Sequence, residues 1–241
     1  ELVPLIDQFN ALLERIENAY SQMEGFNADV AHELCTPLAT LIANNELALR
    51  RPEQEDMREV LASNLEELHR LTAIVNDMLF LSQADRGVGA RRAPVVSLAS
   101  MAADVLDYHE AALAEAGLTA EVVGDAHGAF DVPLLRRALS NLLGNATRYA
   151  KNGSIVQVTF KPSDEDRVLI RVANCGDTID PEVLPHLFDR FFRGDPARSH
   201  GQSNHGLGLA IVGAIARMRQ GEPVAWSENG VTIVGLGIRA L

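Results

Sequence analysis

The stretch Leu139-Ser140-Asn141-Leu142-Leu143-Gly144-Asn145-Ala146-Thr147-Arg148-Tyr149 decides how the second half of the chain folds. It predicts an amphipathic helix, because its apolar residues recur at helical spacing and continue the face that Leu135 begins. Asn141, Asn145 and Tyr149 recur every four residues on the opposite face. A helix with this pattern buries its apolar face against another layer of structure.

The sequence on both sides of this helix alternates between helical and strand periodicity. It predicts helices over 97–116, 132–150 and 206–219. It predicts strands over 119–123, 128–131, 154–161, 167–173, 223–227 and 231–238. This mixture indicates an α+β two-layer sandwich. The polar segment 193–205 shows no periodic spacing of hydrophobic residues, which is typical of a mobile loop.

The first 85 residues have helical periodicity and no strand signal. A polar stretch over 51–56, with Pro52 where a helix can begin, separates one long helix from a second and so predicts a helical hairpin. Two amphipathic helices cannot enclose their own apolar stripes, so we expect a homodimer with a four-helix bundle. Residues 87–93 have the composition of a linker. The fold class is thus multidomain, an all-α hairpin followed by the α+β sandwich.

Composition excludes several classes of protein. The 241 residues are 47% hydrophobic and 22% charged, which is typical of a folded protein. The net charge of −12 argues against nucleic acid as a partner. No apolar run is long enough to span a membrane, and two distant cysteines, Cys35 and Cys175, favour a reducing compartment. Since the chain starts at Glu1, we expect a fragment or a processed product.

The helical stretch from His32 to Pro37 could carry chemistry. His32 and Thr36 lie one turn apart, away from the apolar stripe, so His32 is expected to face water. Pro37 offers no N–H to the carbonyl of Glu33 and is expected to bend the helix. Neutral imidazole is a nucleophile whose proton Glu33 could accept. An ordinary surface histidine followed by a chance proline is the alternative.

Three further stretches suggest a binding site. The amide oxygens of Asn141 and Asn145 suit Mg²⁺, with Tyr149 near a base or ribose and Arg148 near a phosphate, although a solvated polar face is the alternative. Gly206-Leu207-Gly208 runs directly into an apolar helix, whose first backbone amides attract an anion. A tight turn that binds no ligand is the alternative. Asn174-Cys175-Gly176-Asp177-Thr178-Ile179 ends a strand with a glycine, where a backbone can approach a ligand.

Taken in order, these stretches resemble the five boxes of a sensor histidine kinase of two-component signalling. His32-Glu33-Leu34-Cys35-Thr36-Pro37-Leu38 looks like the H box, Asn141-Leu142-Leu143-Gly144-Asn145-Ala146 the N box, Asn174 to Ile179 the G1 box, Leu187-Phe188-Asp189-Arg190-Phe191-Phe192-Arg193 the F box, and Gly206-Leu207-Gly208-Leu209-Ala210-Ile211-Val212 the G2 box. The segment from Glu1 to Ile16, with Phe9-Asn10-Ala11-Leu12-Leu13-Glu14-Arg15, also looks like the final helix of a HAMP relay domain.

The resemblance implies four parts: the end of a HAMP-like helix over 1–21, a dimerisation and phosphotransfer hairpin over 22–86, a linker over 87–93 and a Bergerat-type (GHKL) ATP-binding domain over 94–241. It implies that His32 attacks the γ-phosphate of ATP, with Glu33 as base and Mg²⁺ held by Asn141 and Asn145. The implied nucleotide contacts are Asn141, Asn145, Arg148, Tyr149, Asn174, Gly176, Ile179, Phe188, Arg193, Gly206, Leu207, Gly208 and Leu209. The segment from Arg193 to His205 would form a lid.

The resemblance also implies partners and a second activity. The partners would be a second copy of the chain, ATP or ADP, and the receiver domain of a response regulator, whose Asp would accept the phosphoryl group. Thr36 matches the position that aligns water to hydrolyse a phospho-aspartate, although it could instead bond the carbonyl of His32. The complete protein would sit in a bacterial inner membrane with this portion, itself not membrane-spanning, in the cytoplasm.

The sequence departs from the family pattern at several positions. Asn174 stands where an Asp that accepts the adenine amino group is usual, and Thr178 where a second Gly is usual, a pattern of the metal-sensing and envelope-responsive branch. Asn204, His205 and Cys35 also differ from the common residues. Two other functions stay open: a Bergerat ATPase that drives a conformational clamp with His32 idle, and a degenerate kinase that only dimerises and binds a regulator or acts as a phosphatase.

Overall fold

The computed structural model describes residues 3–50, 57–87, 89–90, 93–95, 97–163, 166–194 and 205–240. The chain divides into two compact units, Glu1–Val75 and Asn76–Leu241. The turn expected around Pro52 and most of the lid expected between Arg193 and His205 lie outside the described residues. Among the helices that are described, none is both long and apolar enough to cross a lipid bilayer.

The first unit is a helical hairpin, as the sequence predicts, and the last part of its second helix, from Asn76, belongs to the second unit. Helix α1 covers Val3–Arg50 and continues through Pro37, whose side chain is buried, and helix α2 covers Met57–Asp85. Polar side chains join the two helices: Asn64 Nδ2 donates to Asn45 Oδ1 at 3.1 Å, and Asn44 Nδ2 donates to Ser63 Oγ at 3.2 Å. These bonds fix the register of the hairpin near its turn.

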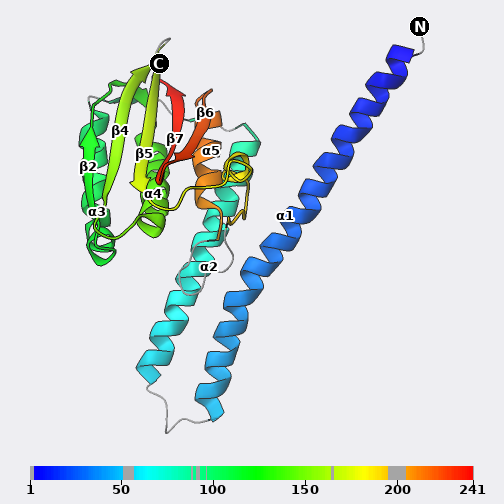
Figure 1. Cartoon of the computed structure of the whole chain (residues 1–241). Coiled ribbons are helices and arrows are strands. Elements are labelled where there is room, and N and C mark those ends of the chain that lie inside the picture. The colour runs from blue at the N-terminus through cyan, green and yellow to red at the C-terminus, as the bar shows by residue number, and fades with distance from the viewer. Residues whose placement is uncertain are drawn as a thin grey trace. The chain divides into compact units, whose positions relative to one another are not determined.

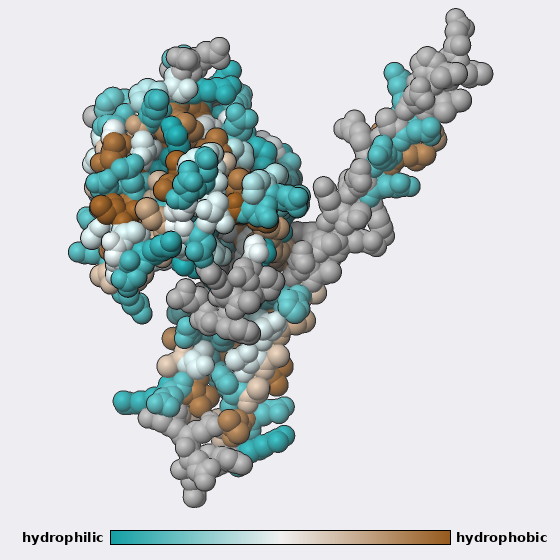
Figure 2. All heavy atoms as spheres, viewed as in Figure 1, coloured by the Kyte–Doolittle hydropathy of each residue, from teal (hydrophilic) through white to brown (hydrophobic). Residues whose placement is uncertain are grey.

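Besides the face of α2 that packs inside the hairpin, a stripe of apolar residues on this helix stays exposed. Ile74 of α2 is fully buried, but Leu61, Leu65, Leu68 and Val75 are each more than 40% exposed. These four residues recur at helical spacing on one face of α2, a face different from that of Ile74. Figure 2 shows hydrophobic residues in brown at the surface of the hairpin helices. One copy of the hairpin therefore does not bury all of its apolar surface.

The second unit has a five-stranded sheet in the order β2-β4-β5-β7-β6. The strands are β2 (Thr119–Val123), β4 (Ile155–Ser163), β5 (Arg167–Cys175), β6 (Glu222–Glu228) and β7 (Val231–Arg239). Only the β2–β4 pair is parallel, and the other three pairs are antiparallel. Helices α3 (Leu98–Glu115), α4 (Val132–Tyr149) and α5 (Gly208–Met218) lie on one face of the sheet (Figure 1).

The core lies between that face and the helices. Alternate residues of β4 and β5 are buried, among them Phe160 and Ile170, and the apolar face of α4 meets them with Leu139 and Leu142, each 1% exposed. Polar atoms also join α3 to α4, because His109 Nε2 lies 2.7 Å from Ser140 Oγ. Burial lowers the pKa of His109 below its usual value. The predicted α+β two-layer sandwich is confirmed, and α4 has its apolar face in the core.

Two short elements are absent from the sequence prediction. Strand β1 (Ala93–Val95) pairs antiparallel with β3 (Gly128–Phe130), beginning at the pair Ala93 and Phe130. A single 3₁₀ turn, η1, covers Leu184–His186. Three residues are too few to reveal a period, so neither element has a signal that sequence patterns can detect.

Candidate functional site

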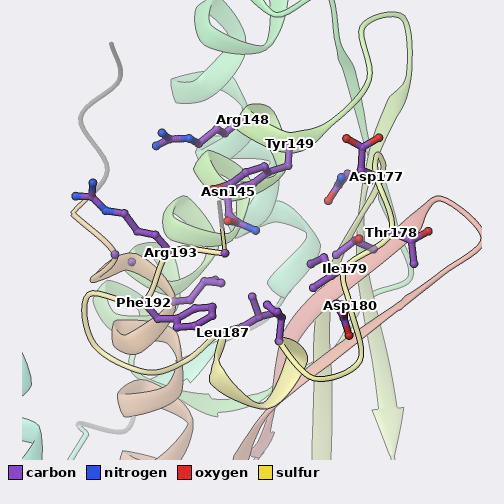
Figure 3. Close-up of a pocket in the computed structure, with 17 residues that line it drawn as sticks. Asn145, Arg148, Tyr149, Asp177, Thr178, Ile179, Asp180, Leu187, Phe192 and Arg193 are labelled. Atoms are coloured by element: carbon purple, nitrogen blue, oxygen red, sulfur yellow. The ribbon is translucent and has the colours of Figure 1, made fainter. Parts of the chain in front are cut away.

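The second unit contains a cavity of about 340 Å³ where four segments and one strand meet. These are the end of α4, the end of β5 with the loop after it, the segment over 187–194, the start of α5, and β7 (Figure 3). The lining residues are Asn145, Arg148, Tyr149, Asn174, Asp177, Thr178, Ile179, Asp180, Val183, Leu187, Phe192, Arg193, Gly194, Gly206, Gly208, Leu209 and Thr232. Segments that are distant in the sequence thus form one site.

The structure brings together most of the nucleotide contacts expected from the sequence. Nine of them line the cavity: Asn145, Arg148, Tyr149, Asn174, Ile179, Arg193, Gly206, Gly208 and Leu209. Four others lie outside the lining. Leu207 is 1% exposed and belongs to the core. The side chain of Phe188 lies next to Gly213 of α5. Gly176 directly precedes Asp177, which lines the cavity, and Asn141 lies against Gly208, which also lines it.

Asn141 is held in one orientation by its own helix. Its Nδ2 donates to the carbonyl of Arg137 at 3.0 Å, so its Oδ1 is the atom left for another partner. A Cβ placed on Gly208 would lie 2.9 Å from that Oδ1. The side-chain oxygen of Asn141 therefore lies against the start of α5, next to the cavity, with Asn145 one turn further along α4.

The start of α5 borders the cavity through Gly206, Gly208 and Leu209. Gly206 has φ of +68°, and a Cβ there would lie 2.6 Å from the backbone of Phe191, so only glycine suits this position. The amide of Phe191 donates to the carbonyl of Gly206 at 3.0 Å, which ties the preceding segment to the start of the helix. The first amides of a helix have no partner within the helix and attract anions.

Charge is distributed unevenly around the cavity. Arg148 and Arg193 lie on one side of it, and Asp177 and Asp180 lie on the other (Figure 3). Asn145 projects from α4 between these two sides. An anionic group in the cavity is therefore favoured on the side of the two arginines, which leaves the opposite side for an uncharged part of a ligand.

Hydroxyl groups hold Thr178 and Ile179, in the loop after β5, against strands β6 and β7. Ser227 Oγ lies 2.8 Å from Thr232 Oγ1 and accepts a bond from the amide of Ile179 at 2.9 Å. Thr178 Oγ1 accepts a bond from the amide of Gly230 at 3.0 Å. The side chain of Thr178, which departs from the glycine of the family pattern, thus fixes the loop after β5 to the turn between β6 and β7.

Eight lining residues were not among the nucleotide contacts expected from the sequence: Asp180, Val183 and Thr232, together with Asp177, Thr178, Leu187, Phe192 and Gly194, which lie in stretches that the sequence singled out. Seven of them lie on irregular segments, where no periodicity assigns a direction to a side chain. Thr232 has a detectable signal, because it is a polar residue at an inward position of an otherwise apolar strand and is 5% exposed.

The first unit holds the other candidate residues. His32 is exposed on α1, as expected from helical geometry. Thr36 Oγ1 donates to the carbonyl of His32 at 3.0 Å, which is the alternative left open by the sequence. Glu33 is half-buried, and Cys35 is exposed on the same helix. The nucleophile candidate and the cavity therefore belong to different units.

A cavity with a helix start, two arginines and two amides is suited to a nucleotide, and family comparisons agree. Residues 130–236 match the family described as "Histidine kinase-, DNA gyrase B-, and HSP90-like ATPase". Residues 22–87 match the "His Kinase A (phospho-acceptor) domain". The chain belongs to the sensor histidine kinases.

Individual relatives support this assignment. The chain is 42% identical over 230 residues to the sensor histidine kinase CusS of Escherichia coli (strain K12), covering 95% of this chain and 48% of CusS. It therefore spans about half the length of that relative. The histidine kinase AdeS of Acinetobacter baumannii has the same fold, with a TM-score of 0.73 and 22% identity, covering 87% of this chain and 98% of that one. The histidine kinase ThkA, solved in complex with the response regulator protein TrrA, has a TM-score of 0.67 and 18% identity, covering 93% of this chain and 64% of that one.

Proposed function

We propose that this chain phosphorylates itself on His32 with ATP and passes the phosphoryl group to an aspartate of a response regulator. The observation that carries the proposal is the cavity with Asn145, Arg148, Arg193 and the start of α5, in the same chain as the exposed His32 on α1. The complex of ThkA with TrrA supports a receiver domain as partner.

The roles of the residues follow from their positions. The amide oxygens of Asn141 and Asn145 would hold Mg²⁺, which neutralises phosphate charge when bound; the Oδ1 of Asn141 suits this role because its Nδ2 is already engaged. Arg148, Arg193 and the first amides of α5 would hold the phosphates. An imidazole nitrogen of His32 would form a bond to the γ-phosphorus of ATP while the bond between that phosphorus and the leaving oxygen of ADP breaks. Glu33 would accept the proton that the imidazole loses.

The test of this function follows the label from ATP to a second protein. With γ-labelled ATP and Mg²⁺, the label is expected first on the chain and then on the aspartate of the cognate receiver domain. Release of inorganic phosphate with no label on the chain at any time would instead indicate an ATPase, and no turnover at all would indicate a module that only binds its partners.

The proposal includes the domain limits and setting expected from the sequence. Residues 1–21 would end a HAMP-like helix, 22–86 would form the phosphotransfer hairpin, 87–93 the linker and 94–241 the ATP-binding domain. The complete protein would lie in a bacterial inner membrane with this portion in the cytoplasm. The partners would be a second copy of the chain and a receiver domain.

The exposed stripe of α2 supports dimerisation and gives a prediction. Leu65→Glu is expected to weaken the dimer at least about tenfold, because a charge would enter an apolar interface that Leu61 and Leu68 also form. Sedimentation of the full chain measures this change. Ala73→Glu is the matched control, since Ala73 is exposed but lies outside the stripe. A wild-type chain that sediments as a monomer would contradict the four-helix bundle.

We propose a second activity, hydrolysis of the phospho-aspartate of the regulator, and assign Thr36 to it. Its bond to the carbonyl of His32 uses the hydroxyl proton and leaves lone pairs on Oγ1 that can accept a bond from a water. Thr36→Ala is expected to slow dephosphorylation of the regulator about tenfold or more, while labelling of His32 stays near wild type. The two rates are measured on the same preparations. Equal changes in both rates would mean that Thr36 only shapes the helix.

A further inference from the structure

The buried end of the cavity contains an amide without a partner. Asn174, at the end of β5, lines the cavity and is 4% exposed. Among the residues that the structure describes, none exchanges a hydrogen bond with its side chain. Because Asn174 lines the cavity and no described residue bonds its side chain, the amide can bond a ligand there. Its neighbour across the sheet is Thr232, which lines the same cavity.

Charge decides which part of a nucleotide meets Asn174. The phosphates are drawn to the arginine side of the cavity and to the start of α5. Asn174 belongs to the opposite side, since it directly precedes the loop that carries Asp177 and Asp180 (Figure 3). The base is therefore the part of the nucleotide that reaches Asn174.

The amide of Asn174 and the hydroxyls beside it can each switch between donating and accepting a hydrogen bond. A carboxylate only accepts hydrogen bonds, whereas an amide offers an oxygen that accepts and a nitrogen that donates. No bond to a described residue holds the Asn174 amide in one orientation, so rotation about its last side-chain torsion exchanges the two atoms. The hydroxyls of Thr232 and Ser227 bond each other at 2.8 Å and can each donate or accept.

The six-membered rings of adenine and hypoxanthine present opposite patterns to such groups. Adenine has an amino donor at C6 and an acceptor at N1, whereas hypoxanthine has a carbonyl acceptor at C6 and a donor at N1. A carboxylate facing the C6 carbonyl would leave two acceptors unpaired in a buried site, which is costly. The amide of Asn174 can donate to that carbonyl after rotation, and the neighbouring hydroxyls can rotate with it.

We infer that Asn174 sets the base specificity of this site and that the chain accepts hypoxanthine nucleotides about as well as adenine nucleotides. This inference rests on the proposed function, because it assumes a purine nucleotide in the cavity. The chemistry of the phosphoryl transfer does not change, since the phosphates lie at the other end of the site.

The test compares the binding of ADP and IDP, each with Mg²⁺, by calorimetry on the full chain. The wild type is expected to bind IDP within about tenfold of ADP. Asn174→Asp is expected to raise the ratio of the IDP to the ADP dissociation constant at least about tenfold over wild type. Gln220→Glu is the matched control, because it makes the same change at an exposed residue just beyond α5 and should leave the ratio unchanged.

The outcomes separate this inference from the proposed function. If Asn174→Asp folds and its ratio differs less than tenfold from that of wild type, the inference is wrong while nucleotide binding stands. If the variant does not fold, the wild-type ratio decides: a preference for ADP above about tenfold overturns the inference. If wild type binds neither nucleotide, the proposed function fails, and the inference fails with it.

Discussion

Replacement of His32 by Gln is expected to reduce labelling of the chain by γ-labelled ATP to background. The amide nitrogen of Gln is not a nucleophile at neutral pH, so no stable bond to phosphorus can form. Binding of Mg-ADP should be unchanged, because His32 is exposed on α1 whereas the cavity belongs to the second unit. Labelling and calorimetry on the same preparation measure the two effects.

A second histidine makes the comparison specific. His69 is also exposed, on α2 of the same hairpin, and His69→Gln should leave labelling near wild type. If the His32 variant is labelled as fast as wild type, the nucleophile lies elsewhere in the chain. If both variants lose labelling, the loss comes from the hairpin as a whole.

Replacement of Asn145 by Ala is expected to weaken Mg-ATP binding and labelling together, each by at least about tenfold. The side chain of Asn145 projects into the cavity from α4 (Figure 3), and alanine would remove an oxygen ligand of the proposed metal ion. Asn145→Asp keeps an oxygen but adds a charge, and we expect it to disturb both quantities as well. Calorimetry with Mg-ATP measures the affinity, and initial labelling rates measure the activity.

The control for Asn145 lies close to the same helix. Asn152 is exposed in the turn after α4, outside the lining of the cavity, so Asn152→Ala should behave as wild type. An Asn145→Ala variant with normal Mg-ATP affinity would show that α4 presents only a solvated polar face. Loss of binding with an unfolded circular dichroism spectrum would instead place the defect in the core packing of α4.

Long periodic segments account for what the sequence predicts about the fold. Helices α1, α2, α3 and α4 have hydrophobic residues at helical spacing, and this spacing identifies their type. Leu139 and Leu142 show why this works: their spacing fixes the buried face of α4, and that face places Asn145 on the opposite side. Prediction of the buried face of a helix therefore also predicts part of the site.

The remainder of the site depends on tertiary structure. Asp180 and Phe192 enter the lining from irregular segments whose course is set by bonds such as that from the amide of Phe191 to Gly206. The orientation of Asn141 likewise depends on its bond to the carbonyl of Arg137. The periodic spacing of hydrophobic residues does not predict these contacts, because each depends on how the folded segments meet. The sequence singles out Asn174, but only the structure shows that its side chain is buried in the cavity lining.

The most direct test of the account is the position and stability of the phosphate that forms on the wild-type chain. After incubation with γ-labelled ATP and Mg²⁺, we expect one labelled residue, His32, with a phosphate that survives alkali and is lost in acid. Mass spectrometry of the phosphorylated chain at alkaline pH locates the residue. Phosphate on a serine, threonine or aspartate, or turnover of ATP with no phosphate on His32, would contradict the assignment of this chain as a kinase of its own histidine.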